Sequence, residues 1–435
     1  MTDNEINLET VVQTEHNFTN QLSDSSSLKK LIDDIGNARF VLLGESSHGT
    51  HEFYYWRAHI TKQLISEKNF NIVCIEGDWP DAYLVNRFVK GNKFSGRSAQ
   101  DVLQNFNRWP TWIWSNWETV ALLEWLRKFN SNIPINKRIG FYGIDLFSFW
   151  ESLEFLSEYL KNRDPLSYQS VIKAISCFEP FKNKEGIDLA HYYKKNEPQC
   201  ADTLDYLLGN IRKNMFNYNG DEEADFNAEQ NAIVVRNAER YFRFMIQNGE
   251  GAWNIRDRHM FETISRLSSY HGPESKFIIW AHNSHIGNAK GFDFGKKGFI
   301  NLGQLMDENF IEDKVYKIGF SFYQGDILAA SNWSGELKRW KVAKAKLNSW
   351  EQLLHKSFPE DSYFFTRNWP FNEKNTLQRS IGVVFDPQTE VQNYNLIDVK
   401  NSYDALLFIE RSSSLHSLKN DASKYQIPES FPFGL

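Results

Sequence analysis

Cysteine and long apolar runs are both scarce in this chain. Only three of its 435 residues are cysteines, Cys74, Cys177 and Cys200. Their spacing fits neither a zinc site nor a disulfide framework, and Cys74 is expected in the core. No apolar run approaches the ~18 residues that cross a bilayer, and the polar, acidic first residues do not resemble a secretory signal. We therefore expect a cytoplasmic protein with no membrane partner.

Excess positive charge and nucleotide-binding motifs are missing as well. The formal net charge of -6 gives no electrostatic basis for binding nucleic acid or an anionic membrane. The G-x-G-x-x-G fingerprint is absent, and segment 91–98 has Arg97 where a phosphate-binding loop needs lysine. The G-x-S-x-G elbow of serine hydrolases is absent too. The sequence predicts no cofactor.

Apolar runs of strand length predict an α/β fold. Near-continuous runs at 41–44, 72–75, 139–144 and 277–281 are typical of strands buried on both faces of a parallel sheet. Helical periodicity covers 52–67, the end of the segment 91–130 from about 116, and 349–357. Further strands are expected at 315–322, 380–386 and 404–409. We predict a mostly parallel central sheet flanked by helices, one composite domain over 1–435, and a large helical insertion at 149–270.

Ionisable side chains follow four of these predicted strands. Glu45 and His48 come after the first, Glu76 after the second and Asp145 after the third, and the fourth is followed by His282 and His285. In an open α/β sheet, ligands bind beyond the carboxyl ends of the parallel strands. A buried carboxylate costs several kcal/mol unless it is paired, so four such strand ends indicate an active site.

His48 is the predicted general base, because an imidazole can accept a proton near neutral pH. The alternative is a helix-capping loop, in which Thr50 caps the following helix and Glu52 occupies its first turn. Capping leaves Glu45 and His48 unexplained. Arg57, on the same helix, is expected to pair with Glu45 or with Glu76 and keep the carboxylates ionised.

A metal site is an open alternative. His48 and His51 form one pair of imidazoles, and His282 and His285 form another. Zinc sites usually need three protein ligands, which these histidines could supply together with a carboxylate. A third possibility is a ligand-binding protein of the haem type, although no cysteine or methionine lies near these histidines in the sequence.

Aromatic residues make up 15% of the chain and are dense between positions 91 and 130. Such residues build either a large core or the wall of an apolar pocket. We predict that Trp79, Trp109 and Trp112 line a substrate pocket, with core packing as the alternative.

Five short motifs occur in order along the chain. They are Gly44-Glu45-x-x-His48-Gly49-Thr50 with Glu52 and Arg57, Ile75-Glu76-Gly77, Tyr142-Gly143-Ile144-Asp145, Arg256-Asp257-Arg258-x-Met260, and Trp280-Ala281-His282-Asn283-x-His285. Together, over roughly residues 30–410, they resemble the erythromycin esterase family. Segments 256–260 and 301–305 are more similar to family members without an assigned substrate.

The resemblance implies an α/β hydrolase that opens the ester of a 14-membered macrolactone without a metal. By position, His48 matches the general base of the family, and Glu45, Glu76, Arg57, His282 and His285 match its other cleft residues. We expect Glu45 to orient His48, and His285, with His282, to donate to the oxyanion or the leaving alcohol. We also expect His51, Asp145 and Arg258 to contact a small-molecule ester or lactone.

Overall fold

The structure is a computed structural model of the 435-residue chain. It describes residues 19–92, 96–184, 187–193, 200–214, 222–311, 314–368, 376–418, 430–432 and 434. The polar, acidic first residues lie outside these ranges. No helix within them is both long and apolar in the way that crossing a membrane demands.

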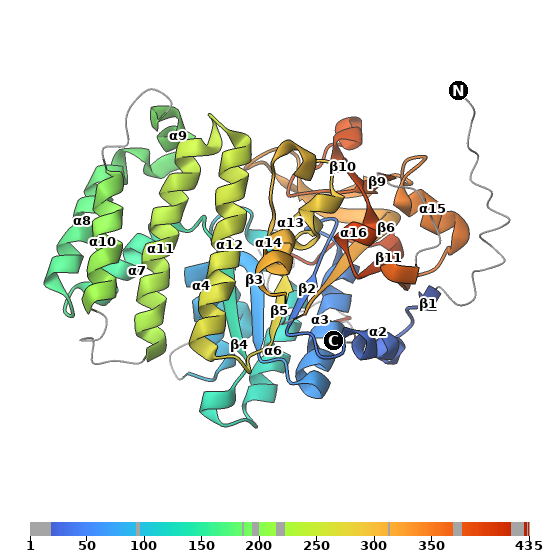
Figure 1. Ribbon diagram of the computed structural model, residues 1–435, viewed down its shortest axis with the longest axis horizontal. Helices are drawn as coiled ribbons and strands as arrows, with labels where there is room; N and C mark the ends of the chain where they lie inside the picture. Colours follow the sequence, from blue (N-terminus) through green and yellow to red (C-terminus); the bar gives the residue numbers. More distant parts are fainter. Residues whose placement is uncertain are drawn as a thin grey trace.

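A nine-stranded sheet forms the centre of the described chain (Figure 1), in the order β1-β8-β11-β6-β2-β5-β3-β4 with β7 beside β6. Its middle is parallel and consists of β11 (Ala405–Ser412), β6 (Val315–Ala330), β2 (Phe40–Leu43), β5 (Phe277–Trp280), β3 (Ile72–Asp78) and β4 (Gly140–Asp145). Antiparallel pairing adds β8 (Ser362–Phe365), β1 (Thr19–Gln21) and β7 (Leu337–Val342). A separate pair joins β9 (Thr376–Arg379) to β10 (Tyr394–Ile397). The predicted mostly parallel sheet is confirmed.

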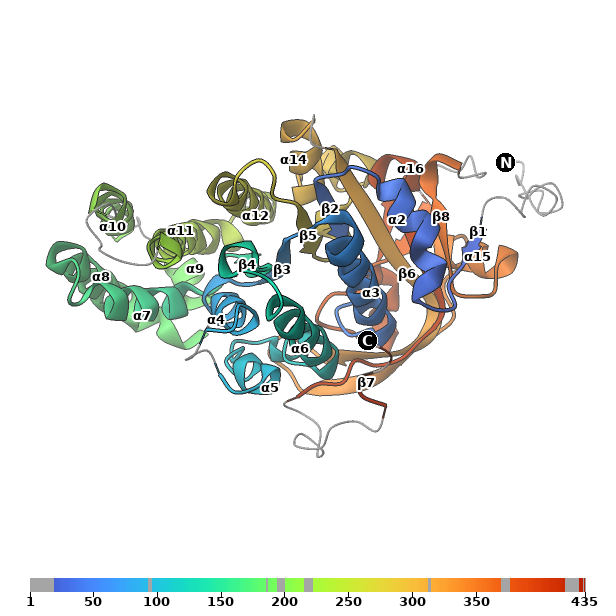
Figure 2. The ribbon, with the colours of Figure 1, turned by 90° about the horizontal axis from the view of Figure 1, so that it is seen from below.

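Alternate residues of the buried strands face two different helix layers, as the twofold strand period requires. Val41 and Leu43 of β2 pack into the cluster that includes α2 (Lys29–Ile35), α3 (His51–Lys68), α5 (Ala99–Leu103) and α6 (Trp117–Asn130). Phe40 and Leu42 pack toward α12 (Gly249–His271), α14 (Leu302–Asn309), α15 (Trp350–Ser357) and α16 (Val399–Ser402). Figure 2 shows α3 and α6 on one side of the strands and α12 and α14 on the other. The central strands are therefore covered on both faces.

Between β4 and β5 the chain is helical and builds its own apolar cluster. The helices are α7 (Phe149–Leu160), α8 (Pro165–Phe178), α9 (Ile187–Tyr193), α10 (Ala201–Asn214) and α11 (Glu222–Met245), and α12 leads back to the sheet. Their shared cluster includes Leu153, Val171 and Leu204. Figure 1 shows these helices extending to one side of the sheet. The helices fall where the sequence predicts them, while the single-domain assignment stays a prediction.

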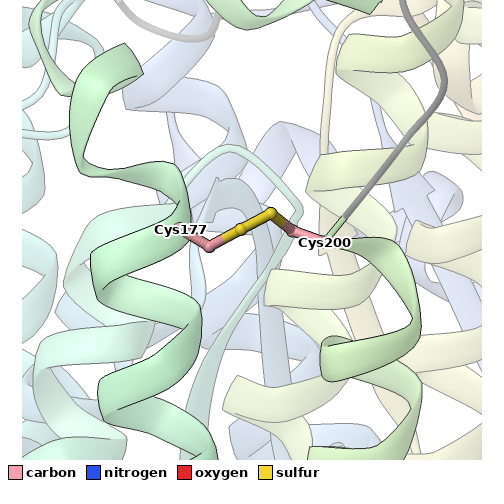
Figure 3. The surroundings of a disulfide bond; sticks show 2 residues. All are labelled: Cys177 and Cys200. Carbon is pink, nitrogen blue, oxygen red and sulfur yellow. A yellow bond between two sulfur atoms is a disulfide. The ribbon is translucent and has the colours of Figure 1, made fainter.

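One disulfide departs from the sequence prediction. Cys177, near the end of α8, is bonded to Cys200, just before α10, with their Cα atoms 6.4 Å apart (Figure 3). The expectation that the cysteines form no disulfide is wrong, because the fold of α8 back toward α10 brings together residues that are 23 positions apart. Cys74 is buried in β3 as a free thiol, as expected.

One strand prediction also changes. Segment 380–386 is not a strand: Ile381 and Val384 form single bridges, to Ser47 and Ala330, because the ladder with β10 ends at Arg379. The strands β2 and β3 follow one another among the parallel strands of the sequence but are not neighbours in the sheet, since β5 lies between them and pairs with both. That insertion places His282, just after β5, between the carboxylates that follow β2 and end β3.

Candidate active site

Four neighbouring parallel strands, β2, β5, β3 and β4, end at one edge of the sheet. Their ends open into a cavity of about 1010 Å³. His48, Glu76, Asp145, His282 and His285 all line it. Strand ends at positions 45 to 285 thus form one site, as expected from the strand pattern.

Glycines and a strand irregularity let the backbone bring these groups together. A Cβ on Gly44 would lie 2.1 Å from Asn283 Oδ1, and one on Gly49 would lie 1.8 Å from the carbonyl oxygen of Leu328. Only glycine permits such approaches. The register of β3 against β4 also shifts between Ile75 and Asp78, at Glu76. Such bulges redirect a side chain next to a functional site.

His48 is held by a buried carboxylate on its own loop. Its Nδ1 lies 2.7 Å from Glu45 Oε1, and Glu45 Oε2 accepts a hydrogen bond of 2.8 Å from Arg57 Nη2. The Arg57 guanidinium lies 4.4 Å from the ring centroid of Tyr54 and 4.6 Å from that of Trp280. With the Nδ1–H of His48 donating a hydrogen bond to Glu45, the Nε2 atom is left as the nitrogen that can accept a proton. Arg57 pairs with Glu45 and not with Glu76.

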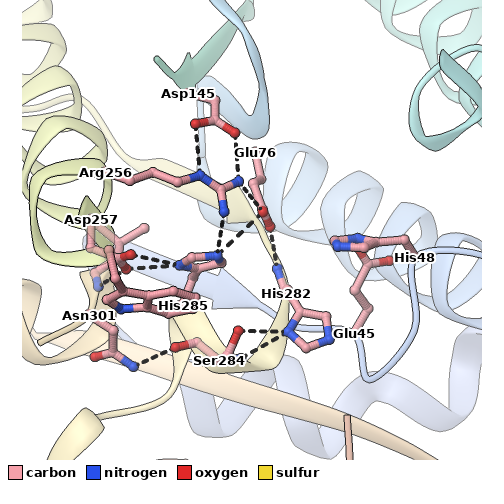
Figure 4. Close-up of polar contacts among 12 residues, drawn as sticks. Glu45, His48, Glu76, Asp145, Arg256, Asp257, His282, Ser284, His285 and Asn301 are labelled. Atoms are coloured by element: carbon pink, nitrogen blue, oxygen red, sulfur yellow. Dashed lines mark hydrogen bonds and ion pairs between the residues drawn. The ribbon is translucent and has the colours of Figure 1, made fainter. Parts of the chain in front are cut away.

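Arg256, on α12, connects the two carboxylates on the other side of the cleft (Figure 4). Its Nη2 donates to Glu76 Oε1 at 2.6 Å and to Asp145 Oδ2 at 2.7 Å, and its Nε donates to Asp145 Oδ1 at 3.0 Å. Burial alone would raise the pKa of Glu76, but the charges of His285 and Arg256 hold it well below its usual range. Burial acts in the same way on Asp145, and Arg256 again lowers its pKa. Both carboxylates are ionised because one guanidinium lies between them.

His285 is bonded through both ring nitrogens. Its Nδ1 lies 2.9 Å from Asp257 Oδ1, and its Nε2 lies 3.2 Å from Arg256 Nη1 and 3.4 Å from Glu76 Oε1. The Trp253 ring stacks on it with centroids 4.6 Å apart. Burial acts to lower the pKa of His285, but the negative charges of Asp257 and Glu76 raise it. His285 is therefore fixed in place as part of a charge network.

His282 is bonded to side chains through one ring nitrogen only. Its Nδ1 accepts hydrogen bonds from the Ser284 N–H at 3.2 Å and from Ser284 Oγ at 2.8 Å, at the start of α13 (Asn283–Ile286). The Nε2 atom is buried and contacts no side-chain partner among the described residues, and the backbone of Ile381 acts weakly on the ring. Burial, together with the nearby His48, lowers the pKa of His282 well below its usual value. His282 is thus a neutral imidazole with an Nε2–H donor, and its ring centroid lies 5.1 Å from that of His48.

Several predicted substrate contacts do not line this cavity. Trp79 is buried, stacks on Tyr142 and donates to Asn227 Oδ1, and Trp112 is buried in the core around α3 and α6. Arg258 is on the exposed face of α12. Trp109 reaches the cavity only through Trp333, whose ring it contacts. For the tryptophans the cause is that aromatic density predicts burial, not which side of a helix faces a pocket.

The aromatic wall comes mainly from the helices between β4 and β5. It includes Phe106, Trp114, Phe147, Phe149, Trp150, Phe178, Phe181, Tyr241, Phe242, Trp253, Phe294, Phe299 and Trp333. Four carboxylates, Asp78, Asp81, Glu151 and Glu154, lie among these rings. Arg256, Asp257 and Trp253 are not predicted as site residues by the sequence, although the first two belong to the motif at 256–260. The sequence does contain a signal for a second arginine in the site, because two buried carboxylates at strand ends need more positive charge than Arg57 alone supplies.

The four imidazoles of the metal alternative do not converge on one point. His51 binds Glu118, 2.7 Å from its Nδ1. His48 and His285 each use Nδ1 for a different carboxylate, and no group of three potential ligand atoms among the described residues contains His48, His282 or His285. The separation arises because α3 begins at His51, so its side chain leaves the helix start in a different direction from His48.

Comparisons with known proteins identify the family of the chain. The sequence model described as erythromycin esterase matches residues 65–412. A curated relative, erythromycin esterase type II of Escherichia coli, is 21% identical over 90% of this chain and 93% of its own length. The putative hydrolase YbfO of Bacillus subtilis (strain 168) is 22% identical over 71% of this chain and 70% of its own.

Solved structures share the fold. A crystal structure titled succinoglycan biosynthesis protein has a TM-score of 0.76 at 19% identity, covering 95% of this chain and 100% of its own. An erythromycin esterase mutant in its open conformation has a TM-score of 0.68 at 16% identity, covering 91% of this chain and 98% of its own. In class, the chain is an α/β esterase-type hydrolase. It belongs to the erythromycin esterase family.

Proposed function

We propose that the cleft hydrolyses a carboxylic ester or lactone by general-base activation of water. The single observation that supports this most is the placement of His48. Its Nδ1 is bonded to a buried, arginine-paired carboxylate, while its ring lines the cavity beside His282. A base oriented by a third group is the arrangement that this chemistry requires.

In the proposed reaction, water attacks the carbonyl carbon while His48 Nε2 takes its proton. Glu45 stabilises the imidazolium, and the new C–O bond moves the carbonyl electrons onto oxygen. The Nε2–H of His282 donates to this oxyanion, since it is a neutral donor that no side chain engages. The C–O bond to the leaving group then breaks, and the alcohol oxygen takes the proton from His48. The products are an acid and an alcohol, and no cofactor takes part.

The remaining cleft groups act by position in this proposal. Arg57 keeps Glu45 ionised, and Arg256 does the same for Glu76 and Asp145. Glu76 Oε2 accepts a hydrogen bond of 2.7 Å from the backbone N–H of His282, which fixes the start of α13. We assign His285 to this supporting network and the donor role to His282, because both nitrogens of His285 are engaged.

The cavity supports a large, mostly apolar substrate. Its volume of about 1010 Å³ is at the upper end of the range for small-molecule sites. Aromatic rings form most of the wall, and two of its carboxylates, Asp78 and Glu154, are paired with Arg108 and Lys182, which also line the cavity. A 14-membered macrolactone fits this description, and a cytoplasmic location fits such a role.

A substrate panel tests the proposal. Simple esters, small lactones and 14-membered macrolides are incubated with the protein. Mass spectrometry looks for a gain of one water by each lactone and for the acid and the alcohol released from each simple ester. We expect turnover of at least one large lactone or ester, absent with His48→Ala. Failure of the whole panel, or equal turnover by the variant, contradicts the proposed function.

Ser284 provides the sharpest test of water as the attacking group. Its Oγ donates to His282 Nδ1 at 2.8 Å, so a serine–histidine pair also exists in the cleft. With water as nucleophile, Ser284→Ala retains most of the activity, because the Ser284 backbone N–H still bonds to His282. Loss of turnover, together with a covalent acyl-protein trapped from the unmodified chain, would show that serine attacks instead.

A further inference from the structure

A second histidine–carboxylate group lies outside the cleft, where the segment after β11 returns to the helices. His51 is the first residue of α3, Glu118 is in the first turn of α6, and His416 lies on the returning segment. The backbone fixes this segment in place: the His51 N–H donates to the Ser413 carbonyl at 2.9 Å, and the Trp117 N–H donates to the His416 carbonyl at 2.9 Å. Three distant parts of the chain therefore meet at defined positions.

Both imidazoles point at the same oxygen atom. His51 Nδ1 lies 2.7 Å and His416 Nδ1 lies 2.6 Å from Glu118 Oε1. One ligand atom from each residue falls within 4.8 Å of the others. The rings stand at 86° to each other with centroids 5.5 Å apart, so the three groups approach from different directions. No other set of His, Cys, Asp or Glu side chains in the described ranges meets this criterion.

This ligand set suits a transition metal. Two imidazoles and one carboxylate are a common zinc set, with bonds of about 2.0–2.2 Å and a fourth position for water. A tetrahedral ion with such bonds separates its ligand atoms by roughly 3.3 Å, so a small outward rotation of the two rings makes room. The Glu118 side chain is 0% exposed, whereas those of His51 and His416 are 16% and 30% exposed. The rings can rotate, and an ion can enter from solvent.

We propose that His51, Glu118 and His416 bind a divalent transition-metal ion of the zinc class, which fastens segment 413–417 to the starts of α3 and α6. The ion takes Nδ1 of both rings and a carboxylate oxygen, and each neutral ring keeps its proton on Nε2. The site is structural and does not depend on the proposed hydrolysis. One of its ligands, His51, lies only three residues after His48, so a bound ion also restrains the end of the loop that carries His48.

Metal titration tests the proposal. The full chain is stripped with a chelator and titrated with Zn²⁺ in competition with a chromophoric chelator, and Co²⁺ is added separately to follow its visible absorption. We expect one ion per chain, Co²⁺ bands typical of nitrogen and oxygen ligands, and a Tm that rises with free Zn²⁺. His416→Ala and Glu118→Gln should each weaken Zn²⁺ binding at least tenfold and remove the Tm increase.

The chain supplies a matched control. His355 Nδ1 lies 2.8 Å from Glu410 Oε1 and its side chain is also 30% exposed, but this pair belongs to no three-ligand cluster. His355→Ala should bind Zn²⁺ as the unmodified chain does. Absence of binding by the unmodified chain, or equal binding by His416→Ala, overturns the proposal. So does loss of binding in His282→Ala with binding kept in His416→Ala, because the ion then sits in the cleft. If Glu118→Gln fails to fold, the more exposed His416→Ala decides.

Discussion

The two sides of the cleft are built in different ways and leave their histidines in different states. One side, Glu45, His48 and Arg57, comes from 13 consecutive residues, and His48 keeps one ring nitrogen toward the cavity. The other side, centred on Arg256 and His285, draws carboxylates from β3, β4 and α12, and every nitrogen of His285 is bonded. A histidine that exchanges protons with a substrate needs one ring nitrogen without a protein partner. A histidine that holds neighbouring charged groups in place needs hydrogen bonds at both ring nitrogens.

The largest effect on activity is expected from a substitution of His48, on the side of the cleft formed by Glu45, His48 and Arg57. His48→Ala should lower kcat/KM by about 10²–10⁴-fold, the usual contribution of a general base. The fold should survive, because the His48 side chain is bonded only to Glu45 among the described contacts. Steady-state kinetics on the best substrate of the panel measures this, with His355→Ala as the control. A decrease of less than tenfold would remove His48 from the mechanism.

Breaking the closed side should cost stability as well as activity. Arg256→Gln leaves Glu76 and Asp145 buried without their shared cation. Removing one partner of a buried ion pair typically costs about 3–5 kcal/mol. Arg57→Gln leaves only Glu45 uncompensated, so urea unfolding should show the greater loss for Arg256→Gln. Equal losses in the two variants would mean that the two sides do not differ as described.

His282 lies between the two sides and should affect the rate without affecting binding. His282→Ala removes the proposed oxyanion donor and should lower kcat by about 10²–10³-fold with little change in KM. His285→Asn should instead lower the Tm, because the ring it removes joins Asp257 to Arg256. A large increase in KM with kcat unchanged in His282→Ala would point to substrate binding as its role.

The smallest expected effect is in the pH dependence of stability. The folded-state pKa of His282 is well below 6.5, so below pH 6.5 the unfolded chain binds a proton that the native chain does not. As the pH is lowered below 6.5, the free energy of unfolding should therefore decrease, by up to about 1.4 kcal/mol per pH unit for this one proton. His282→Asn should give a shallower slope between pH 6.5 and 5, measured by urea unfolding.

Other titratable groups contribute equally to the pH dependence of unfolding in the unmodified chain and in His282→Asn. Three more histidines have pKa values lowered to about 4 and act in the same direction, namely His59, His259 and His271. The lowered pKa of Glu76 stabilises the native chain above pH 4.5, and this stabilisation is lost as the pH falls below that value. A slope for His282→Asn equal to that of the unmodified chain would show that His282 is not held neutral.

The sequence predicted the strands better than the contacts of their side chains. Continuous apolar runs located β2, β3, β4 and β5, and the residues after them line the cavity. Trp79 and Trp112 were misplaced because aromatic character predicts burial but not orientation. The link between Cys177 and Cys200 was missed because it depends on how α8 packs against α10.

The sequence by itself determined one side of the cleft, because its residues are close together in the chain. Glu45 and His48 are three residues apart, and Arg57 follows on α3. Only the tertiary structure decided the rest. Strand order placed β5 between β2 and β3, and the return of α12 brought Arg256 to two carboxylates more than 100 residues away. Contacts of that separation depend on packing of the whole sheet and its helices, which no local sequence pattern encodes.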